Sequence, residues 1–113
     1  SPDKKMTYEN LWPRLILQQG LEQVNILSTG IEWLYGGKTH RECGPAVISC
    51  SGTKEWWKRG KRHRENGPAI ISENGSQFWY RNHRLHRTKG PAITYQNGTQ
   101  FWYTNGKRVL PKS

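Results

Sequence analysis

Hydrophobic and polar residues alternate in short runs along most of the chain, and these runs recur at a fixed interval. Tryptophans mark the recurrence every 23 residues, at Trp33, Trp56, Trp79 and Trp102. Two further elements keep the same interval: the His-Arg pairs beginning at His40, His63 and His86, and the Gly-Pro-Ala tripeptides beginning at Gly44, Gly67 and Gly90. A fixed period of this length is the signature of a repeat architecture. The sequence therefore predicts about three and a half copies of one structural unit.

Turn residues divide each copy into two strands. Asn105-Gly106 is a strong signal for a two-residue hairpin turn, and its place is taken in the earlier copies by Gly36-Gly37, Arg59-Gly60 and Asn82-His83. A second turn recurs at Cys50-Ser51-Gly52, Glu73-Asn74-Gly75 and Gln96-Asn97-Gly98. The predicted fold class is mainly β, an antiparallel meander of repeated hairpins that forms one elongated sheet.

The turn at Asn82-His83 sets the register of its hairpin. Arg81 is predicted to lie opposite Arg84, and Tyr80 opposite Leu85. Because side chains alternate between the faces of a strand, one face is predicted to hold the repeat tryptophans and histidines. The other face is predicted to hold Leu34, Trp57, Tyr80 and Tyr103 together with Arg41, Arg64 and Arg87. Each Gly-Pro-Ala is expected to begin a strand, and the aliphatic residues that follow it to form the main core.

The chain before the repeats has a different pattern. Residues 1–29 are expected to cap the sheet of residues 30–113, all within one domain. Residues 7–17 predict a short helix that starts at the cap residue Thr7 and ends at Gly20, and residues 21–27 predict a strand. Ser1 to Lys5 are interpreted either as a tag remnant ahead of a native start at Met6, or as the end of a longer upstream portion.

Two resemblances follow from these motifs. The last copy, Phe101-Trp102-Tyr103-Thr104-Asn105-Gly106-Lys107, resembles the MORN repeat. The His-Arg-x-x-Gly-Pro-Ala form is similar to hairpin repeats of phage and large-virus proteins, and the likeness covers residues 30–110. The resemblance implies a MORN-like elongated sheet that acts as a scaffold, interaction or dimerisation module, with phospholipid binding in some members. It also suggests a virus-encoded protein acting on a host or viral complex.

Charge is concentrated in the repeats. The chain has a net charge of +10, and residues 30–113 hold fifteen Lys and Arg against five Glu. A body of this kind attracts acidic partners in general, whether nucleic acid, an anionic membrane surface or an acidic protein face.

No group of residues predicts catalysis, and no cofactor is expected. The repeat histidines would lie on rungs about 10 Å apart, whereas the ligands of a zinc ion each lie about 2 Å from it, so no metal site is expected. The single Asp is Asp3, and no Ser, Cys or Thr has the context of a nucleophile. Cys43 and Cys50 would be separated by a strand, about 20 Å, and are interpreted as free thiols in a reducing, cytoplasmic compartment.

Charge and aromatic content together predict a non-catalytic binding module for an acidic protein partner. Binding of single-stranded or structured RNA or DNA is the alternative, because interleaved arginines and aromatics can contact phosphates and stack on bases. An anionic membrane surface comes third, and an exposed aromatic face also allows a homodimer. The candidate partner-binding residues are Arg41, Trp57, Lys58, Arg59, Lys61, Arg62, Arg64, Tyr80, Arg81, Arg84, Arg87, Tyr103, Lys107 and Arg108.

Overall fold

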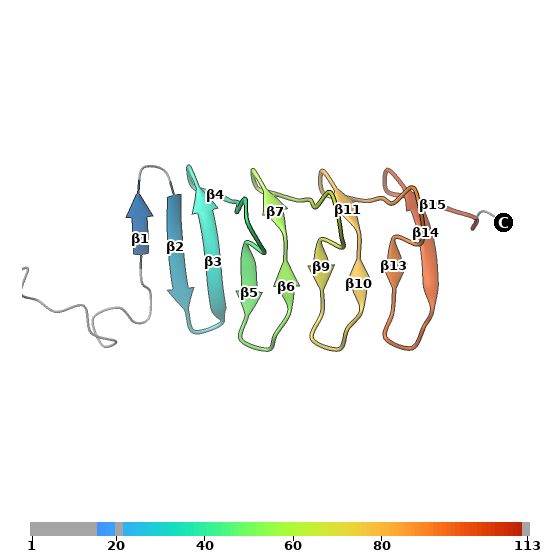
Figure 1. The fold of residues 1–113 in the computed structure, drawn as a ribbon, viewed down its shortest axis with the longest axis horizontal. Helices are drawn as coiled ribbons and strands as arrows, with labels where there is room; N and C mark the ends of the chain where they lie inside the picture. Colours follow the sequence, from blue (N-terminus) through green and yellow to red (C-terminus); the bar gives the residue numbers. More distant parts are fainter. Residues whose placement is uncertain (1–15, 20–21, 112–113) are drawn as a thin grey trace, which may run out of the picture.

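The computed structural model describes residues 16–19 and 22–111, and their regular structure consists of strands. They form a flat ribbon in which the strands run across the long axis and the repeats follow one another along it (Figure 1). The molecule measures 64 × 28 × 17 Å along its principal axes. The strands are β1 (Ile16–Gln19), β2 (Glu22–Leu27), β3 (Gly30–Tyr35), β4 (Lys38–Thr39), β5 (Val47–Ser49), β6 (Lys54–Glu55), β7 (Trp57–Lys58), β8 (Lys61–Arg62), β9 (Ile70–Ile71), β10 (Gln77–Phe78), β11 (Tyr80–Arg81), β12 (Arg84–Leu85), β13 (Ile93–Thr94), β14 (Gln100–Thr104) and β15 (Lys107–Val109).

The strands form the predicted antiparallel meander. The main sheet has the order β1-β2-β3-β5-β6-β9-β10-β13-β14-β15, with β4 paired to β3. The hairpins β7–β8 and β11–β12 continue its strands at one edge, because Trp56 donates its N–H to Ala69 and accepts at its carbonyl from His63. The predicted register is confirmed, since Tyr80 pairs with Leu85 and Arg81 with Arg84.

Both predicted turns are present. The hairpin turns at positions 36–37, 59–60, 82–83 and 105–106 have two consecutive residues with φ between +51° and +83°. Two positive φ values in a row define the type I′ turn, whose twist matches that of the flanking strands. At the other edge, Ser72 bonds across its loop to Ser76, and the glycine that ends each loop also has a positive φ. The turn residues thus set where the hairpins of each repeat reverse direction.

The N-terminal helix prediction is wrong where the structure can test it. Residues 16–19 form β1, and each of them pairs with a residue of β2. The backbone groups of this segment are satisfied by a neighbouring strand, and this pairing overrides the local helical pattern. The rest of the predicted helix, residues 7–15, lies outside the described residues. The strand predicted at residues 21–27 is confirmed as β2, which pairs with β3 over its whole length.

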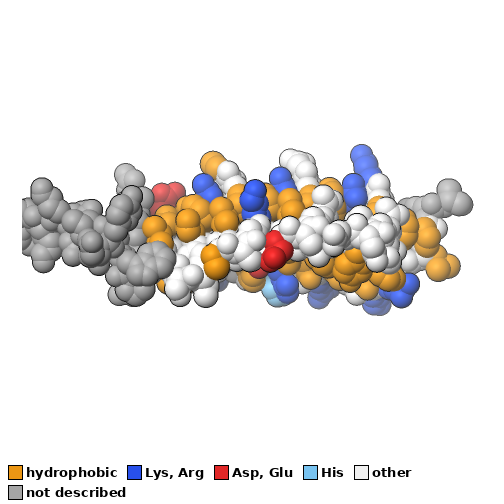
Figure 2. Space-filling view, turned by 90° about the horizontal axis from the view of Figure 1, so that it is seen from below, with side chains coloured by type: hydrophobic (Ala, Val, Ile, Leu, Met, Phe, Trp, Pro, Cys, Tyr) orange, Lys and Arg blue, Asp and Glu red, His pale blue; other side chains and the backbone are white. Residues whose placement is uncertain are grey.

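The core is thin. Ala46, Ala69 and Ala92 are fully buried, and Ile93 is 6% exposed. The Gly-Pro-Ala elements were expected to begin strands, and they lie directly before β5, β9 and β13. The other aliphatic residues expected in the core are only half-buried, because a single-layered sheet leaves both of its faces at the surface. Figure 2 shows hydrophobic side chains along most of the length, with Lys and Arg at both its upper and lower margins.

Candidate binding surface

The two faces of the sheet carry different side chains. Backbone bonds alternate regularly from Lys54 to Lys58, so Lys54, Trp56 and Lys58 share one face. Trp33, Trp56 and Trp79 define this side, hereafter the tryptophan face. Leu34, Trp57, Tyr80 and Tyr103 lie on the opposite face, where the Trp57 indole N–H donates to Glu55 at 2.8 Å.

An arginine covers each of these tryptophans. The Cζ atoms of Arg41, Arg64 and Arg87 lie 3.8 Å from the ring centroids of Trp33, Trp56 and Trp79. Each guanidinium also donates through Nη1 to a proline carbonyl, that of Pro45, Pro68 or Pro91, at 3.1 to 3.2 Å. Burial lowers the pKa of Arg64 and Arg87 below the usual arginine value. Planar stacking with a fixed hydrogen bond is a geometry that arginine provides and lysine does not.

The prediction that these three arginines lie on the other face of the sheet from the tryptophans is therefore wrong. Simple alternation fails because the chain leaves the hairpin after each histidine. Arg41 donates its backbone N–H at 3.3 Å to Trp57, in the next copy, and the side chain turns back over Trp33. The repeat glycine makes this possible, since a Cβ atom on Gly67 would lie 2.7 Å from Cζ of Arg64.

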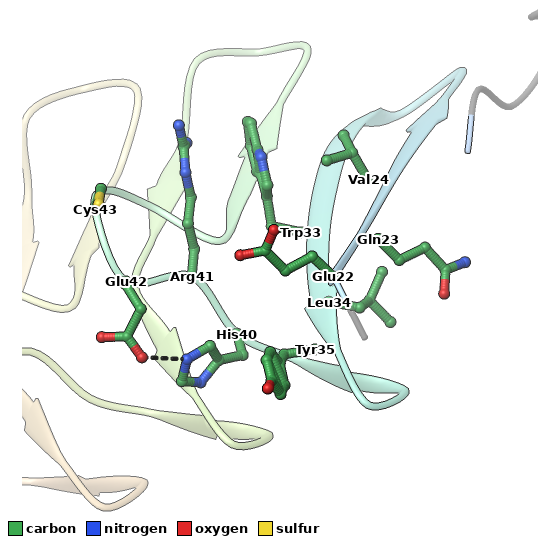
Figure 3. Close-up of a pocket in the computed structure, with 10 residues that line it drawn as sticks. All are labelled: Glu22, Gln23, Val24, Trp33, Leu34, Tyr35, His40, Arg41, Glu42 and Cys43. Atoms are coloured by element: carbon green, nitrogen blue, oxygen red, sulfur yellow. Dashed lines mark hydrogen bonds and ion pairs between the residues drawn. The ribbon is translucent and has the colours of Figure 1, made fainter. Parts of the chain in front are cut away.

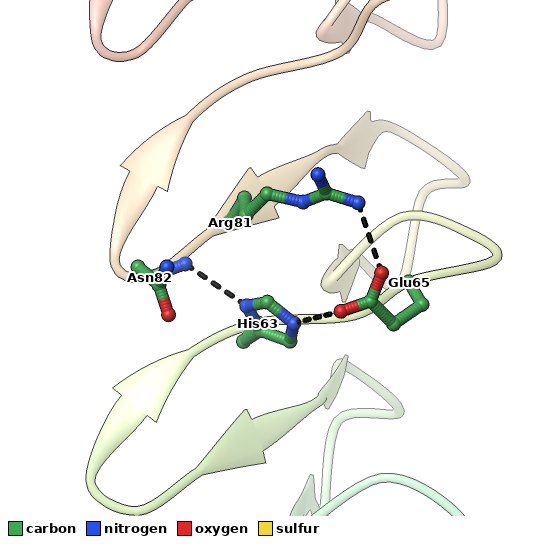
Figure 4. Close-up of polar contacts among 4 residues, drawn as sticks. All are labelled: His63, Glu65, Arg81 and Asn82. Atoms are coloured by element: carbon green, nitrogen blue, oxygen red, sulfur yellow. Dashed lines mark hydrogen bonds and ion pairs between the residues drawn. The ribbon is translucent and has the colours of Figure 1, made fainter.

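Each repeat histidine ties one copy to the next. Nδ1 of His63 accepts the backbone N–H of Asn82 at 3.0 Å, and Nε2 contacts Glu65 at 2.6 Å (Figure 4). His40 makes the equivalent pair of contacts with Arg59 and Glu42. Because Nδ1 accepts, the neutral ring carries its proton on Nε2, which donates to the carboxylate. The same His-x-Glu contact thus recurs in two copies, and Arg81 also lies 2.9 Å from Glu65.

Replacing His63 with alanine is expected to lower the free energy of unfolding by about 1 kcal/mol, through loss of the bond to the next hairpin and of the contact with Glu65. His86 is the matched control. It accepts the N–H of Asn105, but Thr88 stands where Glu65 stands relative to His63. Chemical denaturation should therefore show a larger loss for His63→Ala than for His86→Ala. Equal losses would show that the contact of His63 with the Glu65 carboxylate does not contribute to stability.

The His63 contact gives Glu65 a role in acid stability. The hydrogen bond from His63, and then the charge of Arg81, lower the pKa of Glu65 below its ordinary value of 4.5. A lowered carboxyl pKa stabilises the folded state above the unfolded value, and this contribution is lost as pH falls below about 4.5. Urea unfolding across the acid range should show a shallower loss of stability for Glu65→Gln than for wild type. Glu73→Gln, at a loop position outside the His-Glu pairs, should keep the wild-type slope.

Pairs of like charges occupy two successive hairpins on the tryptophan face. Lys58 pairs directly with Lys61, and Arg81 directly with Arg84, all four with exposed side chains. Like charges directly opposite each other on antiparallel strands are destabilising. Glu65 offsets one of these charges through Arg81, but exposed ion pairs of this kind contribute little. The hairpins thus keep an arrangement that folding alone does not favour.

The balance between cations and acids also changes along the repeats. Glu73 is the last acidic residue, whereas residues 74–113 contain seven Lys and Arg. The basic excess therefore lies towards the C-terminal end of the ribbon, where Lys107 continues the row of hairpin cations. This asymmetry is visible in the sequence alone.

The predicted partner-binding aromatics lie away from these cation pairs. On the opposite face, Arg62 lies 4.5 Å above the ring of Tyr80 and 5.8 Å from that of Trp57. His83 also approaches Trp57, with ring centroids 5.7 Å apart, and Arg108 lies 4.4 Å from the ring of Phe101. These aromatics are partly covered by residues of their own ladder. Arg59 occupies the hairpin tip itself, with φ +54°.

Hollows recur on the tryptophan face at equivalent positions. The first, of about 360 Å³, lies between β2 and the first copy and is lined by Trp33, Tyr35 and His40 among others (Figure 3). Figure 3 shows Arg41 beside Trp33, with His40 bonded to Glu42 below them. The second, of about 530 Å³, includes Trp56, Lys58 and His63, and the third, of about 60 Å³, includes Trp79, Arg81 and His86. Each hollow thus adjoins a hairpin.

No ligand chemistry beyond charge stands out in the described part of the chain. There, no three His, Cys, Asp or Glu residues lie close enough to share a metal ion. Cys43 and Cys50 are free, as predicted, and both are exposed. Across residues 16–19 and 22–111, no helix has the length and apolar character needed to cross a membrane.

Known proteins add nothing to this picture. Comparisons with models of protein families, with curated proteins and with solved structures gave no match. The resemblance to the MORN repeat and to viral hairpin repeats stays a prediction.

Proposed function

We propose that the chain is a non-catalytic repeat scaffold that binds an acidic protein segment through the exposed cations of its hairpins on the tryptophan face. The observation that carries the proposal is the direct pairing of Lys58 with Lys61 and of Arg81 with Arg84 in successive copies. Such pairs oppose folding, and an anionic partner would relieve their repulsion.

An acidic protein fits the surface better than a single-stranded nucleic acid. Nucleic-acid grooves of that type combine cations with open aromatic surfaces on which bases stack. On the tryptophan face, the rings of Trp56 and Trp79 are covered by guanidinium groups at 3.8 Å. The other aromatics, Trp57 and Tyr80, lie on the opposite face from the cation pairs. Binding of the carboxylates of an acidic protein requires only the hairpin cations, whose side chains are exposed.

The proposal is tested with a glutamate-rich peptide and the double variant Lys61→Gln/Arg84→Gln. Its matched control is Lys54→Gln/Lys89→Gln, which removes the same charge away from the hairpins. At low ionic strength the hairpin variant should lose affinity by about tenfold, and the control by about twofold or less. Equal losses would reduce the effect to net charge, and no peptide binding by wild type would overturn the proposal.

Two further arms address the alternative partners. Single-stranded RNA with the same number of charges, and vesicles containing anionic lipid, are titrated under the same conditions. Tighter binding of RNA that also depends on Trp57 and Tyr80 would favour the nucleic-acid alternative. Binding to vesicles but not to the peptide would favour a membrane surface.

A further inference from the structure

Taking the proposed function as its basis, we propose that the partner segment is an acidic polyproline II helix with a carboxylate at every third residue. It would lie along the hairpins on the tryptophan face, across the direction of the strands. The hairpin cations of successive copies would each meet one carboxylate.

The spacing of the cations is set by the sheet. Each copy contributes two strands, so equivalent residues of successive hairpins lie about 9.6 Å apart. Backbone bonds hold the hairpins in this ladder, since Gly60 donates to Thr39, His83 to Arg62 and Gly106 to Leu85, at 2.8 to 2.9 Å. The cations therefore form a row of fixed period, rather than a diffuse patch.

Among regular peptide conformations, polyproline II matches this period best. Its side chains return to the same face every three residues, after about 9.3 Å. An α-helix returns after about seven residues and 10.5 Å, and a strand returns after about 6.6 Å or 13 Å. Over the three steps between the hairpins of Lys38 and Lys107, the accumulated mismatch is about 1 Å for polyproline II and about 3 Å for the helix.

The surface also suits the backbone of such a helix. Polyproline II makes no internal hydrogen bonds, so its carbonyl groups are free to accept from Lys and Arg side chains. The hollows beside the hairpins include Lys58 in one copy and Arg81 in the next, so the cations border recesses that recur along the face. Cation row and hollows thus repeat together.

The test compares two synthetic peptides of identical composition. One consists of repeated Glu-Pro-Pro units, and in the other the same glutamates are irregularly spaced. Fluorescence anisotropy at low ionic strength should show about tenfold tighter binding of the regular peptide, because several ion pairs form in register at once. In the Lys61→Gln/Arg84→Gln variant this preference should fall to about twofold or less.

The same measurements distinguish the polyproline II geometry from the binding of an acidic partner in general. Equal affinity for both peptides, with the hairpin variant still impaired, would overturn the polyproline II geometry and leave the acidic-partner function standing. A heptad-spaced acidic helical peptide that binds more tightly than either would also overturn the geometry. If wild type bound no acidic peptide, both the polyproline II geometry and the acidic-partner function would be overturned.

Discussion

Replacing Arg64 with alanine is expected to lower the free energy of unfolding by about 2 to 4 kcal/mol. The substitution removes the stacking of the guanidinium on Trp56 and the hydrogen bond to the carbonyl of Pro68. It also uncovers Gly67, against which the guanidinium packs. An exposed charged residue would lose far less, so this size of effect marks Arg64 as part of the structure.

Two variants control this prediction. Arg59→Ala removes an exposed arginine at the hairpin tip of the same copy and should cost about 0.5 kcal/mol or less. Arg64→Lys keeps the charge but not the planar stack, and it should recover less than half of the loss. Urea unfolding of the three variants measures these differences. An Arg64→Ala loss no greater than that of Arg59→Ala would contradict the stacking role.

Gly30→Ala is expected to destabilise the N-terminal end of the sheet by more than about 3 kcal/mol. Gly30 has φ +145° and lies between two strands, paired with Leu27 of β2 and Ser49 of β5. A Cβ atom there would lie 2.2 Å from the carbonyl oxygen of Ile48, which is backbone and cannot move without breaking the sheet. Thermal or urea unfolding measures the loss.

Gly75→Ala separates the close contact from the backbone conformation. Gly75 has φ +92°, but nothing lies within 4 Å of a Cβ atom placed on it. Its replacement should therefore cost only the strain of a left-handed residue, about 1 to 2 kcal/mol. If the two variants lose the same stability, the close approach to Ile48 is not what requires glycine at position 30.

Much of the fold followed from local signals that the structure preserves. The 23-residue period and the turn pairs, such as Asn105-Gly106, predict the meander because turn residues alone fix strand length and register. The pairing of Arg81 with Arg84 follows directly from the turn between them. These features depend on local sequence and not on contacts between the repeats.

The predictions that failed needed contacts between copies. Alternation placed Arg64 on the wrong face because it assumes that the strand continues after His63, whereas the chain turns to bond with the next hairpin. The role of His63 as an acceptor for Asn82 also joins different copies. For residues 16–19, the local helical pattern gave no sign that β2 would be their partner.

The same contacts change how the candidate site is understood. Arg41, Arg64 and Arg87 are held by tryptophan rings and proline carbonyls, so we assign them to the framework. The exposed hairpin cations, with Lys61 and Arg84 at their centre, are the residues that we propose bind the partner. Removing a like charge from these pairs should leave stability unchanged or slightly raised.

This division between framework arginines and binding cations is tested most directly by one measurement. The affinity of Lys61→Gln/Arg84→Gln for the repeated Glu-Pro-Pro peptide is compared with that of wild type, under conditions where both are folded. The account predicts a loss of about tenfold or more, with no loss of unfolding stability. Unchanged affinity in the folded variant would contradict it.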